Sequence, residues 1–251
     1  MYILPSFPLS ALALQTFSPN GIDSASIQCL ILTKIPVVAL LKLNIDGWSI
    51  VMAGHWNRVI FSPAWITGHL TSVKDIGIEV PVDNPGLPIR LTFEGIHLCV
   101  TSKQLVLTVE RAEDALLEKC RDVAISALKE LPHTPLMAVG VNYHFVAEQP
   151  DDALLQIFNL ADNNRLSDAD VKIRSTIIQR TLLIQDQTVN LSLTLADDKK
   201  VHVAFNFHKD TPSTEQAIAF LGAHSTDLKE KAFDLLNRIY QSTVEPVAAI
   251  L

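Results

Sequence analysis

Cysteine, glycine and charged residues are all scarce in this chain of 251 residues, which has 3 Cys, 9 Gly and 19% charged residues. Cys29, Cys99 and Cys120 are odd in number and widely spaced, and no C-x-x-C pair occurs. This pattern argues against a disulfide scaffold and a zinc ribbon. The sequence also lacks the G-x-x-x-x-G-K-[ST], G-x-G-x-x-G, G-x-S-x-G and H-E-x-x-H motifs. We therefore expect buried, reduced thiols, and we predict no cofactor and no metal site.

Basic residues are few as well. The chain has 20 Lys and Arg and a net charge of −7, which makes nucleic acid an unlikely partner because phosphate contacts need clustered cations. No Lys or Arg precedes Lys34, and Pro5 and Pro8 interrupt the apolar start of the chain, so we expect no secretory signal. The apolar stretch at 35–43 is too short to span a bilayer. These features predict a cytoplasmic protein that does not enter a membrane.

Apolar residues make up 48% of the chain, and in the first half they form patterns typical of strands. Val37–Ile45 and Trp48–Ala53 flank Asp46-Gly47, a pair that predicts a hairpin with a type I′ turn. A long loop is expected over Asp75–Pro88, which is rich in Gly, Pro, Asp and Asn. Further strands are expected at Arg58–Phe61 and, as a hairpin, at Ile96–Val100 and Leu105–Val109.

A helix is expected after these strands. Acidic Glu113 and Asp114 fall in its first turn, apolar residues recur at helical spacing as far as Leu131, and Pro132 ends it. The remaining elements are a strand at Leu136–Val146, a helix at Asp152–Leu160, strands at Ile173–Ile184, Val189–Leu195 and Val201–Phe207, a helix capped by Ser213-x-x-Gln216, and a last helix with an apolar stripe from Leu228 to Ile239.

One short pattern occurs in both halves. Asn142-Tyr143-His144 and Asn206-Phe207-His208 each lie in an expected strand, where alternation puts the aromatic on one face and Asn and His on the other. We therefore predict an α+β protein of two related halves, each an antiparallel sheet packed against helices. The expected boundary divides a β-rich half with one long helix (1–148) from an α+β half (149–251).

The run Leu105–Val109 followed by a helix, and then Ala138–Tyr143, resembles the centre of a sporadically distributed bacterial family without assigned function. The order of the later elements, from Val201–Phe207 to the helix with Phe233, is similar too, so the resemblance covers about residues 90–243. The family's usual Arg-Tyr pair before its central Asn is absent here. The resemblance implies a bacterial, cytosolic α+β protein and carries over no catalytic residues.

Three residues match a loose nuclease pattern. Asp151 is followed by Asp170 and Lys172, the spacing in which two carboxylates bind a metal while a lysine assists hydrolysis. Asp151 also stands where it would cap the helix that follows, which explains it without a metal. We take Asp151, Asp170 and Lys172 as candidate catalytic residues.

The candidate binding residues are polar strand positions and tryptophans. His202, Asn206 and His208 share one strand face, and Asn142 and His144 share a face of the counterpart strand. If the two strands are neighbours, these groups gather into a small polar site or a metal pocket; otherwise they are the solvated face of a sheet. Trp48, Trp56 and Trp65 form either an aromatic recognition surface or part of the core.

The expected function follows from the absence of an active-site motif and from the apolar, weakly charged composition. We expect a non-catalytic protein-binding or assembly component of a bacterial cytosolic complex, whose partner is another protein chain or a second copy of itself. The alternative is a metal-dependent hydrolase or nuclease that uses the acidic pair or the His/Asn face.

Overall fold

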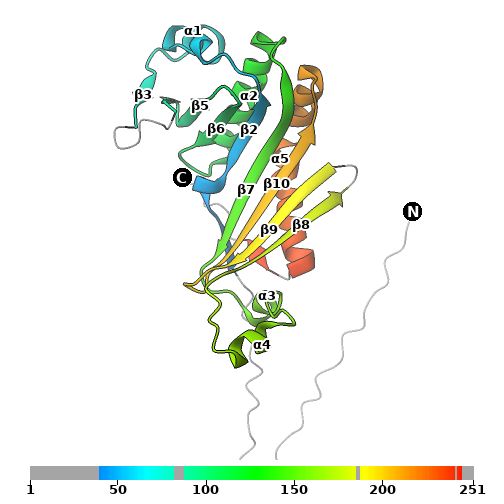
Figure 1. Cartoon of the computed structure of the whole chain (residues 1–251). Helices are drawn as coiled ribbons and strands as arrows, with labels where there is room; N and C mark the ends of the chain where they lie inside the picture. Colours follow the sequence, from blue (N-terminus) through cyan, green and yellow to red (C-terminus); the bar gives the residue numbers. More distant parts are fainter. Residues whose placement is uncertain (1–39, 82–87, 185–186, 241, 245–251) are drawn as a thin grey trace, which may run out of the picture. The chain divides into compact units, whose positions relative to one another are not determined.

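A computed structural model describes residues 40–81, 88–184, 187–240 and 242–244 (Figure 1). Cys29, the apolar start of the chain and the first residues of the strand expected at Val37–Ile45 lie outside the described residues. No helix among the described residues is both long enough and apolar enough to span a membrane.

The strands form one sheet with the order β3-β4-β5-β6-β2-β7-β10-β9-β8, in which all neighbours are antiparallel (Figure 1). β7 is the central, twelve-residue strand Leu136–Ala147. On one side follow β2 (Ser49–Gly54), β6 (Gln104–Val109), β5 (Ile96–Val100), β4 (Arg90–Phe93) and β3 (Gly77–Glu79). On the other side follow β10 (Val201–Asp210), β9 (Gln187–Leu195) and β8 (Thr176–Ile184). Short strands β1 (Leu40–Leu43) and β11 (Thr243–Val244) pair with each other, and β1 also pairs with β7.

Two long helices, α2 (Asp114–Glu130) and α5 (Thr214–Tyr240), contact each other and the same face of the sheet (Figure 1). Their apolar sides meet alternate residues of the central strands, such as Tyr143 and Phe145 of β7 and Phe205 and Phe207 of β10, all at most 2% exposed. Shorter helices connect the strands: α1 (Pro63–His69), α3 (Asp152–Gln156), α4 (Asn163–Asp168) and the 3₁₀ turns η1 (Ile45–Gly47) and η2 (Arg58–Ile60). The opposite face of the central strands has no covering helix among the described elements, and side chains such as Asn142 and His144 of β7 and Asn206 of β10 are partly exposed there.

The expected α+β class is therefore confirmed, but the halves do not form two separate sheets. β7 and β10, on either side of the expected boundary at 148/149, pair directly over ten residues. The strand order instead reads alike in both directions outward from the neighbouring strands β2 and β7. It is β2-β6-β5-β4 in one direction and β7-β10-β9-β8 in the other. Each of these series ends, in chain order, in one of the two long helices.

The hairpin expected around Asp46-Gly47 is wrong. β1 and β2 do not pair with each other; they lie end to end along the same edge of β7, where Leu43 is opposite Phe145 and Ser49 is opposite Asn142. The intervening residues form η1, whose first turn is capped by the Asn44 side chain, 3.2 Å from the Asp46 N–H. Twelve-residue β7 is long enough to pair with two short strands, and backbone pairing with it decides the path of the chain.

Other local differences are smaller. The expected strand at Arg58–Phe61 is the 3₁₀ turn η2, capped by Asn57, and the expected loop over Asp75–Pro88 contains the short strand β3. The helix expected at Asp152–Leu160 ends at Gln156, and one helix, α5, replaces the two that we expected near the C-terminus. Ile239 does not belong to the buried stripe of that helix, because it is 55% exposed. The hairpin of β5 and β6, the long helix α2 and the hairpin of β9 and β10 are confirmed.

The alternation along β10 leads to a stability prediction. Phe207 is fully buried, with its ring centroid 6.0 Å from that of Tyr143, whereas the next residue, His208, points to the uncovered face. Phe207→Ala should lower the free energy of unfolding by about 3–5 kcal/mol, because it leaves a cavity in the core. His208→Ala, the matched control one position along the strand, should cost no more than about 0.5 kcal/mol. Urea unfolding followed by circular dichroism measures both; equal losses would contradict this assignment of the two faces.

Candidate functional site

The uncovered face of the sheet carries a row of polar side chains joined across five adjacent strands. Thr181 Oγ1 donates to Asn190 Oδ1 at 3.1 Å, and Asn190 Nδ2 donates to Asn206 Oδ1 at 3.3 Å. Asn206 Nδ2 then donates to Asn142 Oδ1 at 2.7 Å, and Asn142 Nδ2 donates to Ser49 Oγ at 2.9 Å. We call these five residues the amide ladder. It contains no ionisable side chain, and each amide in it both donates and accepts.

The ladder follows directly from the strand register. Asn142 is opposite both Ser49 and Asn206, and Asn190 is opposite both Asn206 and Thr181. Residues directly opposite each other in an antiparallel pair have Cβ atoms about 4.5–5.5 Å apart, which brings short polar side chains within hydrogen-bonding distance. A shift of one residue in any of these registers would turn the side chain concerned into the core.

A histidine pair lies beside the ladder. Asn44 Nδ2 is 3.2 Å from His144 Nδ1, and His144 Nε2 is 3.2 Å from His202 Nδ1, with the two imidazole rings stacked at a centroid distance of 5.3 Å. Because the Asn44 amide is a donor, these contacts assign the proton of neutral His144 to Nε2, from which it is donated to His202. Burial lowers the pKa of His144 from its ordinary value, and the neighbouring charge of protonated His202 lowers it further.

All five predicted residues of the polar face therefore lie on one surface. Asn142 and Asn206 belong to the ladder, His144 and His202 form the stacked pair, and His208 Nδ1 lies 3.3 Å from Asn190 Nδ2. This surface has an open hollow of about 680 Å³, lined in part by the ladder amides, His144 and the edge residue Gln179.

Two glycines leave room for these contacts. A Cβ on Gly47 would lie 2.3 Å from His144 Cβ, closer than side chains approach each other in proteins. A Cβ on Gly140 would lie 3.1 Å from Asn206 Nδ2. Gly47 has no positive φ, so its role here is close approach to His144 and not the left-handed turn that the sequence suggested.

Sequence reasoning missed four members of this surface. Asn190 and Thr181 stand on the correct face of expected strands, and the same alternation could have placed them beside the His/Asn positions. Ser49 and Asn44 had no comparable signal. Their positions depend on how β1, η1 and β2 follow the edge of β7, and a hairpin would have placed both elsewhere.

The residues of the nuclease pattern have other roles in the structure. Asp151 caps α3, because its Oδ1 accepts the Leu154 N–H at 2.8 Å, which confirms the capping interpretation. Asp170 occupies the left-handed region (φ 56°) just after α4 and is exposed, and Lys172 is exposed on the loop that leads to β8. Within the described part of the chain, no three His, Cys, Asp or Glu side chains are grouped so that they could hold a metal ion.

The three tryptophans do not form one exposed surface. Trp48 and Trp56 are 2% and 4% exposed, and Trp56 Nε1 donates to the Met52 carbonyl at 2.9 Å. Trp65 is half-buried on α1, where its ring stacks on that of His69 at a centroid distance of 4.9 Å. Cys120 is buried and Cys99 is half-buried; both are free thiols whose pKa is raised by burial, as expected for structural cysteines.

The chemistry of the uncovered face is that of hydrogen bonding. Its amides and hydroxyls keep one protonation state at physiological pH, and in the connected set only His144, His202 and His208 can titrate. No protein-family model, curated protein or solved structure matches the chain. The function is therefore inferred from the residues of the chain itself.

The central position of Asn206 in the ladder can be tested by mutation. Asn206→Ala removes the donor to Asn142 and the acceptor of Asn190, so it should lower the free energy of unfolding by about 1–2 kcal/mol. Thr181→Ala removes only the exposed last hydrogen bond and should cost less than about 0.5 kcal/mol. Chemical unfolding of both variants measures the difference. Equal costs would show that the ladder makes no connected contribution to stability.

The lowered pKa of His144 predicts a pH dependence with a definite sign. The unfolded chain binds a proton at His144 near pH 6.5, whereas the folded chain resists it to lower pH. The stability that neutral His144 contributes to the fold is therefore complete above about pH 6.5 and is lost as the pH falls through the folded-state pKa of His144. The melting temperature should fall more steeply below pH 6.5 in the wild type than in His144→Gln. Thr181→Ala is the control, because it lies on the same face and removes no titratable group, and it should keep the wild-type slope; identical slopes for all three proteins would contradict the prediction.

Proposed function

We propose that this chain is a non-catalytic protein-binding component that assembles through the edge strand β8, within a cytosolic complex of the bacterial kind that its sequence resembles. One observation carries the proposal: β8 is a nine-residue edge strand that pairs only with β9 among the described strands. Its other edge leaves a row of backbone N–H and C=O groups for a further strand, which is a common mode of protein recognition.

The side chains of β8 favour such pairing. Ile177 and Leu183 are 60% and 75% exposed on the uncovered face, and Ile178, Leu182 and Ile184 are half-buried on the helix face. Proteins usually protect a long edge strand with proline, a bulge or several charges. Thr176–Ile184 contains no proline and one charged residue, Arg180, which contacts the Tyr240 hydroxyl of α5 at 3.4 Å.

The opposite edge of the sheet is different. β3 has three residues, one of them Gly77, and its Glu79 forms an exposed ion pair with Arg90 of β4. A short, charged edge of this kind does not add strands readily. The contrast between the two edges supports β8 as the side through which the sheet is extended.

The occupant that fits β8 best is β8 of a second copy of this chain. In an antiparallel pair, the start of one strand meets the end of the other, and β8 has apolar residues near both ends, at Ile177–Ile178 and Leu182–Ile184. Centred on Thr181, the pair places Ile178 opposite Ile184 of the second copy and Arg180 opposite its Leu182. Like charges are then not directly opposite, and two threonines meet at the centre, a favourable cross-strand pair.

This arrangement also accounts for where the amide ladder ends. Thr181 is its last member, on the edge strand, and its hydroxyl donates inward to Asn190. In the Thr181-centred pair, the hydroxyls of two copies are adjacent, so the polar rows of both sheets become continuous. We assign the uncovered face, with the amide ladder along it, the role of a hydrogen-bonding surface for the assembled complex.

We also propose that the two series of strands arose by duplication. The identical order outward from β2 and β7, each series completed by a long helix, supports this. The equivalent of β7 is then β2, and the two halves meet between α2 and β7 instead of at 148/149. On this assignment the Asn-aromatic-His pattern of β7 and β10 comes from two neighbouring strands of the same half, whose shared face explains it.

The hydrolase alternative has no comparable support. Asp151 is engaged as a helix cap, and Asp170 and Lys172 lie on an exposed turn and loop. It remains a prediction from spacing alone.

The edge-strand proposal predicts a weak dimer. One strand pair is a small interface, so sedimentation velocity should show a monomer–dimer equilibrium with a Kd on the order of micromolar. Leu183→Lys places a charge at the pairing edge in both copies and should raise Kd at least about tenfold, equivalent to about 1.4 kcal/mol.

Val59→Lys is the matched control. Val59 is also apolar and highly exposed (87%), but it lies on η2, away from β8 in the sheet order, and its substitution should leave Kd unchanged. A wild-type protein that stays monomeric up to about 100 μM, or equal effects of the two lysines, would overturn the β8 assignment.

A further inference from the structure

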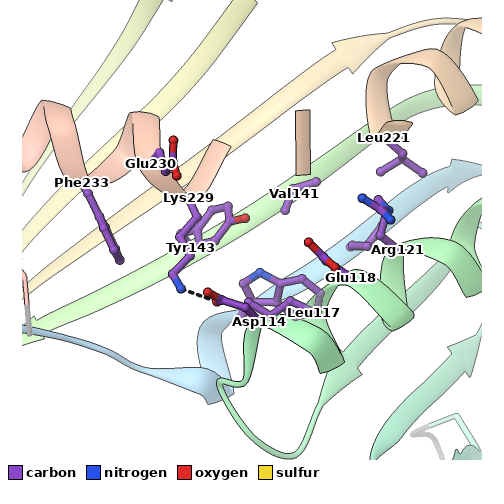
Figure 2. Close-up of a pocket in the computed structure, with 12 residues that line it drawn as sticks. Asp114, Leu117, Glu118, Arg121, Val141, Tyr143, Leu221, Lys229, Glu230 and Phe233 are labelled. Atoms are coloured by element: carbon purple, nitrogen blue, oxygen red, sulfur yellow. Dashed lines mark hydrogen bonds and ion pairs between the residues drawn. The ribbon is translucent and has the colours of Figure 1, made fainter. Parts of the chain in front are cut away.

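A cavity of about 240 Å³ lies on the helix-covered face, between α2, α5 and the strands β2 and β7 (Figure 2). Its wall is largely apolar. Ile50 of β2 and Val141 of β7 line it from the sheet, and Leu117 of α2 with Leu221 and Phe233 of α5 line it from the helices. It is thus separate from the uncovered face and from β8, and does not depend on the assembly proposed above.

Charged side chains surround the cavity. Lys229 of α5 forms an ion pair with Asp114 of α2, drawn as a dashed line in Figure 2, so this contact joins the two helices beside the cavity. The Lys229 side chain is only 13% exposed, and its Nζ lies 5.5 Å from the centroid of the Phe233 ring. Glu118 and Glu230 add two further carboxylates. Arg121 lines the cavity too and forms an ion pair with Asp122 at 2.8 Å, so an anionic ligand would meet three acidic groups and two cations that are already paired.

Two polar groups interrupt the apolar wall. Trp48 is 2% exposed and lines the cavity, and its buried Nε1–H makes no hydrogen bond within the described part of the protein. Tyr143 lies beside it: burial raises the Tyr143 pKa to about 12, and the Trp48 N–H, near the Tyr143 hydroxyl but outside hydrogen-bond geometry, lowers that pKa in part. A buried N–H without a partner is unfavourable, and a ligand that carries an acceptor would relieve that cost.

We propose that this cavity binds a neutral, bicyclic aromatic molecule with one hydrogen-bond acceptor, which accepts the proton of Trp48 Nε1. The volume sets the size of the ligand: an apolar cavity of about 150 Å³ holds benzene, and the larger space here suits a second fused ring. The apolar wall accepts the rings, the acidic surroundings favour a neutral molecule over an anion, and the indole N–H specifies the acceptor.

Quinoline and naphthalene are matched probes for this proposal. They have the same shape, and quinoline, neutral at pH 7.5, has a nitrogen acceptor where naphthalene has a C–H. Each is titrated into the ¹⁵N-labelled full chain, and the three indole N–H signals are followed by NMR; Trp48→Phe identifies the signal of Trp48. Quinoline should move the Trp48 signal downfield to saturation, and naphthalene should bind without this downfield shift.

Two variants separate the hydrogen bond from the cavity. Trp48→Phe should weaken quinoline binding about three- to tenfold, the scale of one hydrogen bond, and change naphthalene binding less than about twofold. Leu221→Phe fills part of the space and should weaken both ligands at least about tenfold, while its amide spectrum shows that the protein is folded. Because neither variant touches β8, both should keep the wild-type dimerisation constant.

Three results would overturn the proposal. They are a Trp48 signal that does not respond to quinoline, equal losses of both ligands in Trp48→Phe, and unchanged affinity for both in folded Leu221→Phe. The first needs only the wild-type protein, so the proposal stays testable if a variant does not fold.

Discussion

The pairing of β7 with β10 is the constraint on which the rest of the structure depends. These strands lie at the centre of the sheet, and their register holds over ten residue pairs. Because side chains alternate along a strand, one register sorts every residue of both strands onto two faces at once. The aromatic residues Tyr143, Phe145, Phe205 and Phe207 meet the helices, and Asn142, His144, Asn206 and His208 meet the other side. The buried aromatic pairs hold the register, and the register in turn aligns the amides.

The two faces therefore have different binding chemistry. On the helix face, α2 and α5 do not fill all the space above Val141 and Tyr143, which leaves the cavity beside Trp48. On the uncovered face, the hollow is open and lined by the amide ladder, which offers donors and acceptors on a surface that ends at the edge strand β8. A small apolar molecule suits the first face, and another polypeptide suits the second together with its edge. Each proposal rests on its own set of residues, so either can fail without the other.

Much of the local structure could be predicted from the sequence. The helical spacing from Leu116 to Leu128 and Pro132 after it located α2, and strict alternation located β9 and β10 to within a few residues. The same alternation correctly put Tyr143 and Phe207 in the core and the Asn and His side chains opposite. The Asp46-Gly47 signal failed, because a turn motif describes only its own few residues, whereas the open edge of β7 offered β1 and β2 a longer pairing partner.

The sequence by itself determined the α+β class, the strands and helices at the centre of the chain, and which side chains share a face, because these depend on periods of 2 and 3.6 residues within one segment. Only the tertiary structure decided which strands are neighbours and in what register. It thereby decided that Asn190 joins Asn206, that Asn44 meets His144, that Trp48 lines a cavity, and that β8 is left at the edge. Those contacts join residues as much as 100 positions apart in the chain. Their energies depend on how whole strands and helices pack together, which the period of any one segment does not contain.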